Sequence, residues 1–425
     1  MTTAPREHLL RSLCGKVDAA VTARREEMLR LLRDALDLAS PSGREGQFTR
    51  FVERWARDHG FGTDLWETDE SALAGFPEAR ARHLPLTGRP TLVVKLPGRG
   101  AEPLILNAHA DTVSGDVTGP ASPGDTRVFG RGACDVKGPL VGALWAMLAI
   151  RQAAPQGLAG DVLLEVVPGE EDSVGLGTLT SVVRGYRGRG AVVLEPTENL
   201  PRCASRGGLR FEVACAGTAV HGTVKWLGRD AIASMRRVLA ALEALEARWN
   251  DRAADPLFAP YPIVRPVTVD CVHGGQWQGM ISDSCRCGGY FELLPSDDLG
   301  QWKERFEKEL RALLPQESLD VRFPEEYTGH RAPAGDALCE AARSVAETAA
   351  KEHPSIGWKG WAAFNSGCEA GLRAREHGTP TLVWGPGSLA QAHTKDEFVD
   401  FRDVETFAGM LSCFAMIYLG HEVNE

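Results

Sequence analysis

Apolar residues recur along this 425-residue chain with two different periods, and the dominant period changes with position. From Glu26 to Ala39 the apolar positions are three and four residues apart, which predicts a helix ending at the turn 40–43. A second helix is predicted just beyond this turn. Its apolar face consists of Phe48, Phe51, Val52 and Trp55.

Short, nearly continuous apolar runs predict strands buried on both faces. They are Thr91 to Leu96, Leu104 to Ala108, Val162 to Val167, Ala191 to Leu194 and Thr381 to Trp384. Helical patterns lie between and after these runs, from Gly138 to about Ile150, near Asp336 to Lys351 and from Val404 to about Leu419. Apolar strands that alternate with helices predict an α/β domain with a mostly parallel sheet.

From about Gly207 the pattern is that of half-exposed strands. Alternating positions from Leu209 to Cys215 predict a strand, and the residues after Ile232 predict an amphipathic helix. The remaining elements are predicted as strands at about 263–272 and 283–293, a helix at 298–314 and a strand at 319–323. This β-α-β-β-α-β order is that of a ferredoxin-like domain. The chain therefore divides into a catalytic domain in two parts, 1–206 and 326–425, interrupted by an inserted α+β domain at 207–325.

The composition limits which partners and which cellular compartment are expected. The formal net charge of −10 argues against nucleic acid or an anionic membrane as the main partner, because both require clustered positive charge. The apolar stretch from Leu140 to Ile150 is too short to span a bilayer, and Met1 to Lys16 contain no apolar signal region. The ten cysteines form no CxxC pair and are interpreted as reduced thiols, so a cytoplasmic protein is expected.

Polar residues with metal-binding side chains follow the ends of the predicted strands. They are His109, Asp135, Glu171, Glu195 and His393. Ligands of open α/β sheets gather at the carboxyl ends of strands, so these residues can share one site. Asp111 lies two positions after His109, where its carboxylate could accept the other imidazole N–H.

Each of these residues also has a structural explanation when it is considered alone. Asp135 lies in a turn with three glycines before a helix and could cap that helix. Glu170 and Glu171 could belong to a solvated acidic loop, although adjacent carboxylates repel each other unless a cation is near.

Considered together, the motifs resemble the metallopeptidase and deacylase family of acetylornithine deacetylase, succinyl-diaminopimelate desuccinylase, aminoacylase and glutamate carboxypeptidase. The resemblance is strongest to members of the acetylornithine deacetylase type. It rests on motifs that occur in order along the chain: LASPSG, LNAHADTV, FGRGACDVKG, PGEEDS, LEPTE, AGTAVHG and GPGSLAQAHTKDE.

The resemblance implies a site for two divalent ions bridged by Asp135, with His109 and Glu195 on one ion and Glu171 and His393 on the other. Zinc is expected, and cobalt or manganese could replace it. The ions would lower the pKa of a bound water, and Glu170 would act as general base and acid.

Relatives also place a histidine of the inserted domain in the site of a neighbouring subunit. His221 matches that histidine, so the resemblance implies a homodimer formed through the inserted domain and a role for His221 at the oxyanion.

Two segments depart from the family pattern. The stretch 289–295 lacks the arginine with which many members bind a substrate carboxylate. The late segment 365–371 contains Glu369 where threonine-aspartate-alanine is more usual, and Glu369 could either meet a substrate amine or cap a helix.

The leading hypothesis is a metal-dependent amide hydrolase that removes a small acyl group from an amino-acid-like amine. A metallo-exopeptidase with the same site is the near alternative, and a non-catalytic metal-binding relative is the alternative from a different class. The identity of the acyl group and of the amine is left open.

Overall fold

A computed structural model describes residues 15–76, 84–117, 126–173, 175–250, 255–353 and 355–420. Most of Met1 to Lys16, where no signal region was predicted, and Cys14 lie outside the described residues. The chain forms two compact units. Unit 1 comprises residues 1–204, 331–364 and 368–425, and unit 2 comprises residues 205–330 and 365–367.

Unit 1 is built on a six-stranded sheet with the order β1-β2-β5-β3-β6-β13. The strands are β1 (Gly62–Trp66), β2 (Thr91–Leu96), β3 (Ala101–His109), β5 (Gly160–Val167), β6 (Gly190–Val193) and β13 (Thr381–Val383). β5, β3, β6 and β13 run parallel, whereas β2 pairs antiparallel with both β5 and β1. The predicted mostly parallel sheet is confirmed, with an antiparallel strand that the apolar run of β2 did not reveal.

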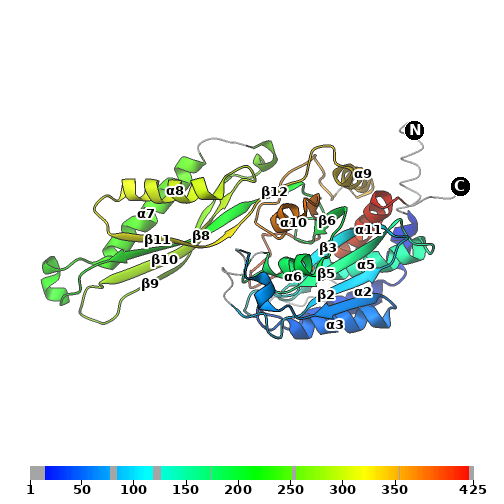
Figure 1. Ribbon diagram of the computed structural model, residues 1–425, viewed down its shortest axis with the longest axis horizontal. Helices are drawn as coiled ribbons and strands as arrows, with labels where there is room; N and C mark the ends of the chain where they lie inside the picture. The colour runs from blue at the N-terminus through cyan, green and yellow to red at the C-terminus, as the bar shows by residue number, and fades with distance from the viewer. Residues whose placement is uncertain are drawn as a thin grey trace. The chain divides into compact units, whose positions relative to one another are not determined.

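Helices cover both faces of this sheet, and Figure 1 shows them around it. On one face α5 contacts β3 and β5, while α9 contacts β13 and α11 contacts α5 and α9. On the other face α6 contacts β2 and β5, and α10 contacts β6 and β13. The helices are α2 (Arg25–Asp37), α3 (Gly46–Asp58), α5 (Gly138–Ala153), α6 (Leu176–Arg184), α9 (Ala337–Glu352), α10 (Ala370–His377) and α11 (Phe401–Tyr418). The double cover explains why the central strands are buried almost continuously.

Unit 2 has a four-stranded sheet with the order β11-β8-β10-β9, in which neighbouring strands are antiparallel. The elements are β8 (Gly207–Ala216), α7 (Ala231–Trp249), β9 (Val267–Gly274), β10 (Ser284–Leu293), α8 (Leu299–Leu313) and β11 (Leu319–Tyr327). Their order along the chain and in the sheet is that of a ferredoxin-like domain. Phe211, Phe291, Phe306, Trp249 and Trp302 form an aromatic core between the sheet and its helices.

Several short elements were absent from the sequence-based expectations. They are β1, α6, α10 and the small antiparallel ladder between β4 (Arg127–Phe129) and β14 (Phe398–Asp400). Each is too short for its apolar period to stand out. The strand expected from Ile263 begins at Val267, because Asn250 accepts hydrogen bonds from the N–H groups of Val264 and Arg265.

The helical run Ala133–Ala153 is long and apolar enough to cross a membrane by length and composition, and it is completely buried in the folded chain. It is longer than the apolar stretch recognised in the sequence because the turn before α5 continues into the helix. The nine cysteines within the described residues are free thiols, in agreement with the expectation of reduced cysteines.

Candidate metal centre

The candidate site lies at the carboxyl edge of the parallel strands of unit 1. β3 ends at His109, β5 ends three residues before Glu170, and β6 ends two residues before Glu195. β3 lies between β5 and β6 and pairs parallel with both. Because neighbouring parallel strands end at the same edge, three segments distant in sequence deliver polar side chains to one place.

Asp135 reaches the same place from an irregular turn before α5. Gly132 begins the turn with φ +85°, and a Cβ at this position would lie 2.9 Å from Cγ2 of Thr112. Both the backbone conformation and the lack of space therefore favour glycine here. Asp135 itself has extended backbone angles. The residue at the N-cap position of α5 is Lys137, so the alternative that Asp135 caps this helix is not what the structure shows.

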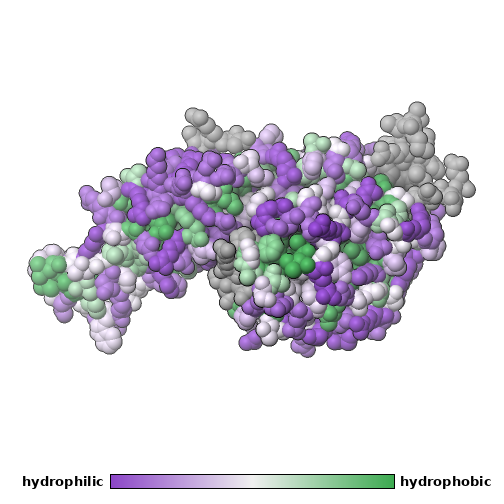
Figure 2. Space-filling model, in the orientation of Figure 1, coloured by the Kyte–Doolittle hydropathy of each residue, from purple (hydrophilic) through white to green (hydrophobic). Residues whose placement is uncertain are grey.

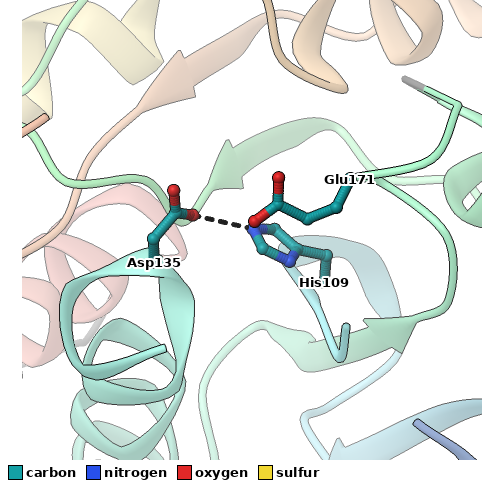
Figure 3. Close-up of side chains that lie close together, drawn as sticks. All are labelled: His109, Asp135 and Glu171. Carbon is teal, nitrogen blue, oxygen red and sulfur yellow. Dashed lines mark hydrogen bonds and ion pairs between the residues drawn. The ribbon is translucent and has the colours of Figure 1, made fainter. Parts of the chain in front are cut away.

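The carboxylate of Asp135 lies between two histidines. Nε2 of His109 is 3.0 Å from its Oδ1, and Nε2 of His393 is 3.4 Å from its Oδ2. His393 is also 3.1 Å from Oε2 of Glu171. Figure 3 shows His109, Asp135 and Glu171 converging, and their ligand atoms lie within 4.8 Å of one another.

The two histidines occupy very different surroundings. His109 is buried at the end of a strand, whereas the side chain of His393 is 52% exposed on a loop. His393 has φ +62°, a left-handed conformation that is uncommon for a residue with a side chain and that is found most often where function requires it.

Glu170 and Glu195 complete the group as electrostatic neighbours of His109. Burial and the nearby carboxyls, Glu171 among them, raise the pKa of Glu170 well above its ordinary value. Burial and the carboxylate of Asp135 likewise raise the pKa of Glu195. The pKa of Glu171 is raised for the same two reasons, burial and the carboxylate of Asp135. Acids gathered in this way disfavour each other's ionised form, and a cation among them removes that penalty.

The pKa shifts of the two histidines and of Asp135 favour their charged forms, whereas those of the glutamates favour the neutral form. Burial would lower the pKa of His109, but the hydrogen bond to Asp135 and the surrounding carboxylates raise it. Hydrogen bonds to Asp135 and Glu171 raise the pKa of His393 to about 10. Although burial opposes ionisation, the two histidines lower the pKa of Asp135. The group as a whole therefore favours positive charge at its centre, and its imidazole nitrogens and carboxylate oxygens fit divalent ions such as zinc.

The position of Asp111 differs from the expectation. Nδ1 of His109 lies 2.9 Å from the backbone oxygen of Asp111, while the carboxylate is 3.8 Å away. That carboxylate instead accepts hydrogen bonds from the N–H groups of Glu170 and Glu171, each at 3.1 Å, and from the hydroxyl of Ser42 at 2.7 Å. The backbone carbonyl can orient the imidazole, and the carboxylate holds the loop that carries both glutamates.

Glu369 lies close enough to this group to interact electrostatically with His109 and Glu170. It occupies the N-cap position of α10, but its side chain makes no capping bond there. The carboxyl accepts the N–H of Thr178 in the first turn of α6 at 3.1 Å, and burial raises its pKa to about 7. It therefore does not cap its own helix.

Sequence reasoning assigned no role to Glu397 or to Arg89. Glu397 is buried and accepts hydrogen bonds from the turn that carries Asp135. Arg89 is buried between Glu45 and Asp172, next to the Glu170–Glu171 loop. Glu397 lies inside the matched segment GPGSLAQAHTKDE, so its place in that motif was the available signal.

His221 belongs to unit 2, where its exposed ring lies 2.8 Å from the hydroxyl of Thr223 and it caps the short 3-10 helix η3 (Gly222–Leu227). Within its own unit His221 thus occupies a turn.

A mostly parallel α/β sheet with carboxylates and imidazoles converging at its carboxyl edge can hold divalent ions, as metallohydrolases do. Residues 105–417 match the model of the Peptidase family M20/M25/M40. This match covers more than half of the chain, so the chain belongs to that family and is a hydrolase of amide bonds.

Among its curated relatives, the chain is 29% identical over 317 residues to an acetylornithine deacetylase from Myxococcus xanthus, covering 72% of this chain and 78% of the relative. It is 24% identical over 431 residues to an N-formyl-4-amino-5-aminomethyl-2-methylpyrimidine deformylase from Bacillus subtilis, covering 91% and 92%. A solved dinuclear metal-binding peptidase of Bacillus subtilis has the same fold, with a TM-score of 0.61, 14% identity and coverage of 94% and 99%.

Proposed function

We propose that this protein is a dinuclear metal-dependent amidohydrolase that removes a small acyl group from an amino-acid-like amine. The observation that carries the proposal is the position of the Asp135 carboxylate, with one oxygen facing His109 and the other facing His393. A carboxylate between two imidazoles can bridge two ions, with Glu195 serving the first and Glu171 the second. Zinc is the proposed metal, and cobalt or manganese would suit the same mixed donors.

The bound ions would supply the positive charge that polarises the substrate carbonyl and acidifies water. Glu170 is the proposed proton carrier. Its carboxylate takes a proton from the water whose oxygen forms a bond to the carbonyl carbon. When the carbon–nitrogen bond then breaks, Glu170 returns that proton to the leaving amine. Asp111 positions this base, because its carboxylate accepts the backbone N–H of Glu170.

A deacylase is favoured over an exopeptidase by the named relatives. The acetylornithine deacetylase and the formylpyrimidine deformylase both release a small acyl group, as their names state. The solved peptidase supports the same fold for the alternative, a metallo-exopeptidase. The stretch 289–295 has no arginine to bind a free carboxylate, which favours an acyl amine without that group over both an N-acyl amino acid and a peptide.

Unit 2 is proposed as a lid and dimerisation domain that would bring His221 to the oxyanion of a neighbouring subunit. β9 forms the edge of its sheet, with unpaired backbone groups on one side. Exposed apolar side chains lie on this unit, among them Val272 on β9 and Ile232, whose side chain lies next to Gly274. Hydrophobic surface is visible on unit 2 in Figure 2. A second copy that pairs with this edge would cover that surface. The free thiols agree with a location in the cytoplasm.

The test is a substrate panel with the purified full-length enzyme loaded with zinc or cobalt. N-acetyl, N-formyl and N-succinyl amines are expected to be hydrolysed with higher kcat/KM than dipeptides. Turnover of dipeptides alone would reject the deacylase in favour of the exopeptidase. The absence of any chelator-sensitive turnover, together with less than one bound ion per chain, would favour a non-catalytic relative.

A further inference from the structure

The ligand-bearing segments around Asp135 and His393 are joined behind the metal centre. β4 precedes the Asp135 turn and β14 follows His393, and the two strands pair, with Phe129 opposite Phe398. The next contact along the ladder is the N–H of Gly130, which donates to the backbone oxygen of Glu397 at 3.1 Å. The two segments are therefore in register up to the last residues before the site.

The side chain of Glu397 continues this connection into the turn itself. Its Oε1 accepts the consecutive N–H groups of Cys134 at 3.2 Å and Asp135 at 3.4 Å. Its Oε2 accepts Nη1 of Arg131 at 2.6 Å. The side chain of Glu397 is only 1% exposed, so water cannot replace these bonds at low cost.

From this geometry we propose that Glu397 is a positioning residue that sets the separation of Asp135 and His393 and thereby the affinity of the second ion. The inference rests on the proposed function, because it requires the dinuclear site. Two N–H bonds to one oxygen fix the orientation of the peptide that carries Asp135. His393, four residues before Glu397, lies on an exposed loop and depends on this connection more than His109, which a strand holds.

The two proposed half-sites should depend on Glu397 to different degrees. The half-site of His109 and Glu195 is held by β3 and by the segment after β6, in the middle of the sheet. The half-site of Glu171 and His393 is completed by a residue with φ +62° on a loop. Loss of Glu397 should therefore weaken the ion at Glu171 and His393 more than the ion at His109 and Glu195.

The experiment measures Co²⁺ binding to the full-length protein by calorimetry, with the melting temperature as a separate readout of folding. Glu397→Ala should raise the Kd of the ion at Glu171 and His393 by roughly 10- to 100-fold. This is the usual cost of losing a partner that orients a metal ligand. Glu397→Gln should raise it less, because one amide oxygen can still accept either Arg131 or the two N–H groups. If the alanine variant does not fold, the glutamine variant carries the test.

Asp297→Asn is the matched control. Asp297 accepts Arg265 at 2.8 and 3.0 Å and the N–H of Leu294 at 2.9 Å, in the connection between β10 and α8 of unit 2. This variant loses a carboxylate that, like that of Glu397, accepts an arginine and a backbone N–H, and it should lower the melting temperature while both Kd values stay unchanged. An equal shift of Kd in Asp297→Asn and Glu397→Gln would reduce the role of Glu397 to general stability and overturn the proposal.

A double-mutant cycle with His393→Ala tests the route of the effect. If Glu397 acts through His393 and the second ion, Glu397→Gln should change little in the His393→Ala background. Independent, additive effects, or an unchanged Kd in Glu397→Gln alone, would overturn the proposal and leave the amidohydrolase intact. A wild-type protein that binds fewer than two ions would instead overturn the dinuclear site and this inference together.

Discussion

Buried carboxyl groups occur in both units, and their surroundings differ. In unit 2, Glu292 is buried and meets the hydroxyl of Tyr327 at 2.7 Å, with Arg206 as the cation nearby. Burial raises its pKa to about 7. In unit 1, the carboxyl groups of Asp135 and Glu171 and the imidazoles of His109 and His393 lie together at a sheet edge.

The comparison teaches that a raised pKa does not by itself mark a catalytic centre. A single buried acid such as Glu292 can resolve its desolvation by holding a proton and a hydrogen bond to Tyr327. The cluster around Asp135 cannot do so with all of its members, because its histidines require carboxylates that are ionised. Convergence of opposite charges, rather than burial, distinguishes the metal centre.

The largest effect is expected from a substitution at the centre of the cluster around Asp135. Asp135→Asn removes the charge that faces both histidines, so neither ion should bind at micromolar concentration and metal-dependent turnover should be lost. Glu292→Gln removes a buried carboxyl of unit 2 and should leave both ions bound. Metal content after dialysis, measured by mass spectrometry, checks this pair. Two ions per chain in Asp135→Asn would contradict its bridging position.

The second effect separates proton transfer from metal binding. Glu170→Gln should lower kcat by roughly 10²- to 10⁴-fold, the usual contribution of a general base, because the amide cannot accept the proton of the attacking water. Both ions should still bind, since Glu170 is not a proposed ligand. Steady-state kinetics beside metal analysis measures the two properties. Turnover near that of the wild type would mean that another group carries the proton.

Part of this candidate centre could be predicted from sequence, because His109, Glu171 and Glu195 follow strand ends that the apolar runs of β3, β5 and β6 mark clearly. The same pattern predicted the inserted unit at 207–325, against the observed compact segment 205–330 with 365–367. Joining 365–367 to unit 2 required tertiary contacts, such as the hydrogen bond between Arg206 and Asn365.

What the sequence could not predict depends on contacts between distant segments. Apart from its place in the motif GPGSLAQAHTKDE, nothing local distinguishes Glu397 from a solvated acid, because its contacts arise from pairing of β4 with β14. The Asp111 carboxylate was expected to contact His109, but the turn of the chain after β3 presents its backbone oxygen instead. Alternation along a strand shows which residues share a face and leaves such local turns undetermined.

A smaller effect concerns the pH dependence of stability in unit 2. The folded pKa of Glu292, about 7, lies above its ordinary value of 4.5, so its contribution to stability is fully present below pH 4.5 and is lost as pH rises through 7. The loss is on the order of 3 kcal/mol between pH 4.5 and pH 8.

Glu292→Gln should remove this part of the pH dependence, because its amide does not ionise. Urea unfolding of the zinc-loaded protein at pH 5 and pH 8, with wild type and variant side by side, measures the difference. If the free energy of unfolding changes by the same amount between pH 5 and pH 8 in the two proteins, Glu292 ionises in the folded state at its ordinary pKa.

The smallest expected effect tests whether unit 2 serves association rather than chemistry. Val272 is 49% exposed on the edge strand β9, so Val272→Lys places a charge on a surface that a second copy would bury. The dimer Kd should rise about tenfold, equivalent to about 1.4 kcal/mol. Val183→Lys is the matched control, because Val183 is 39% exposed on α6 of unit 1, which is not the unit proposed to form the dimer. Sedimentation velocity across a concentration series measures both variants. If both variants shift the Kd equally, β9 is not the dimer edge. If the wild type is monomeric throughout, His221 can act only within its own chain.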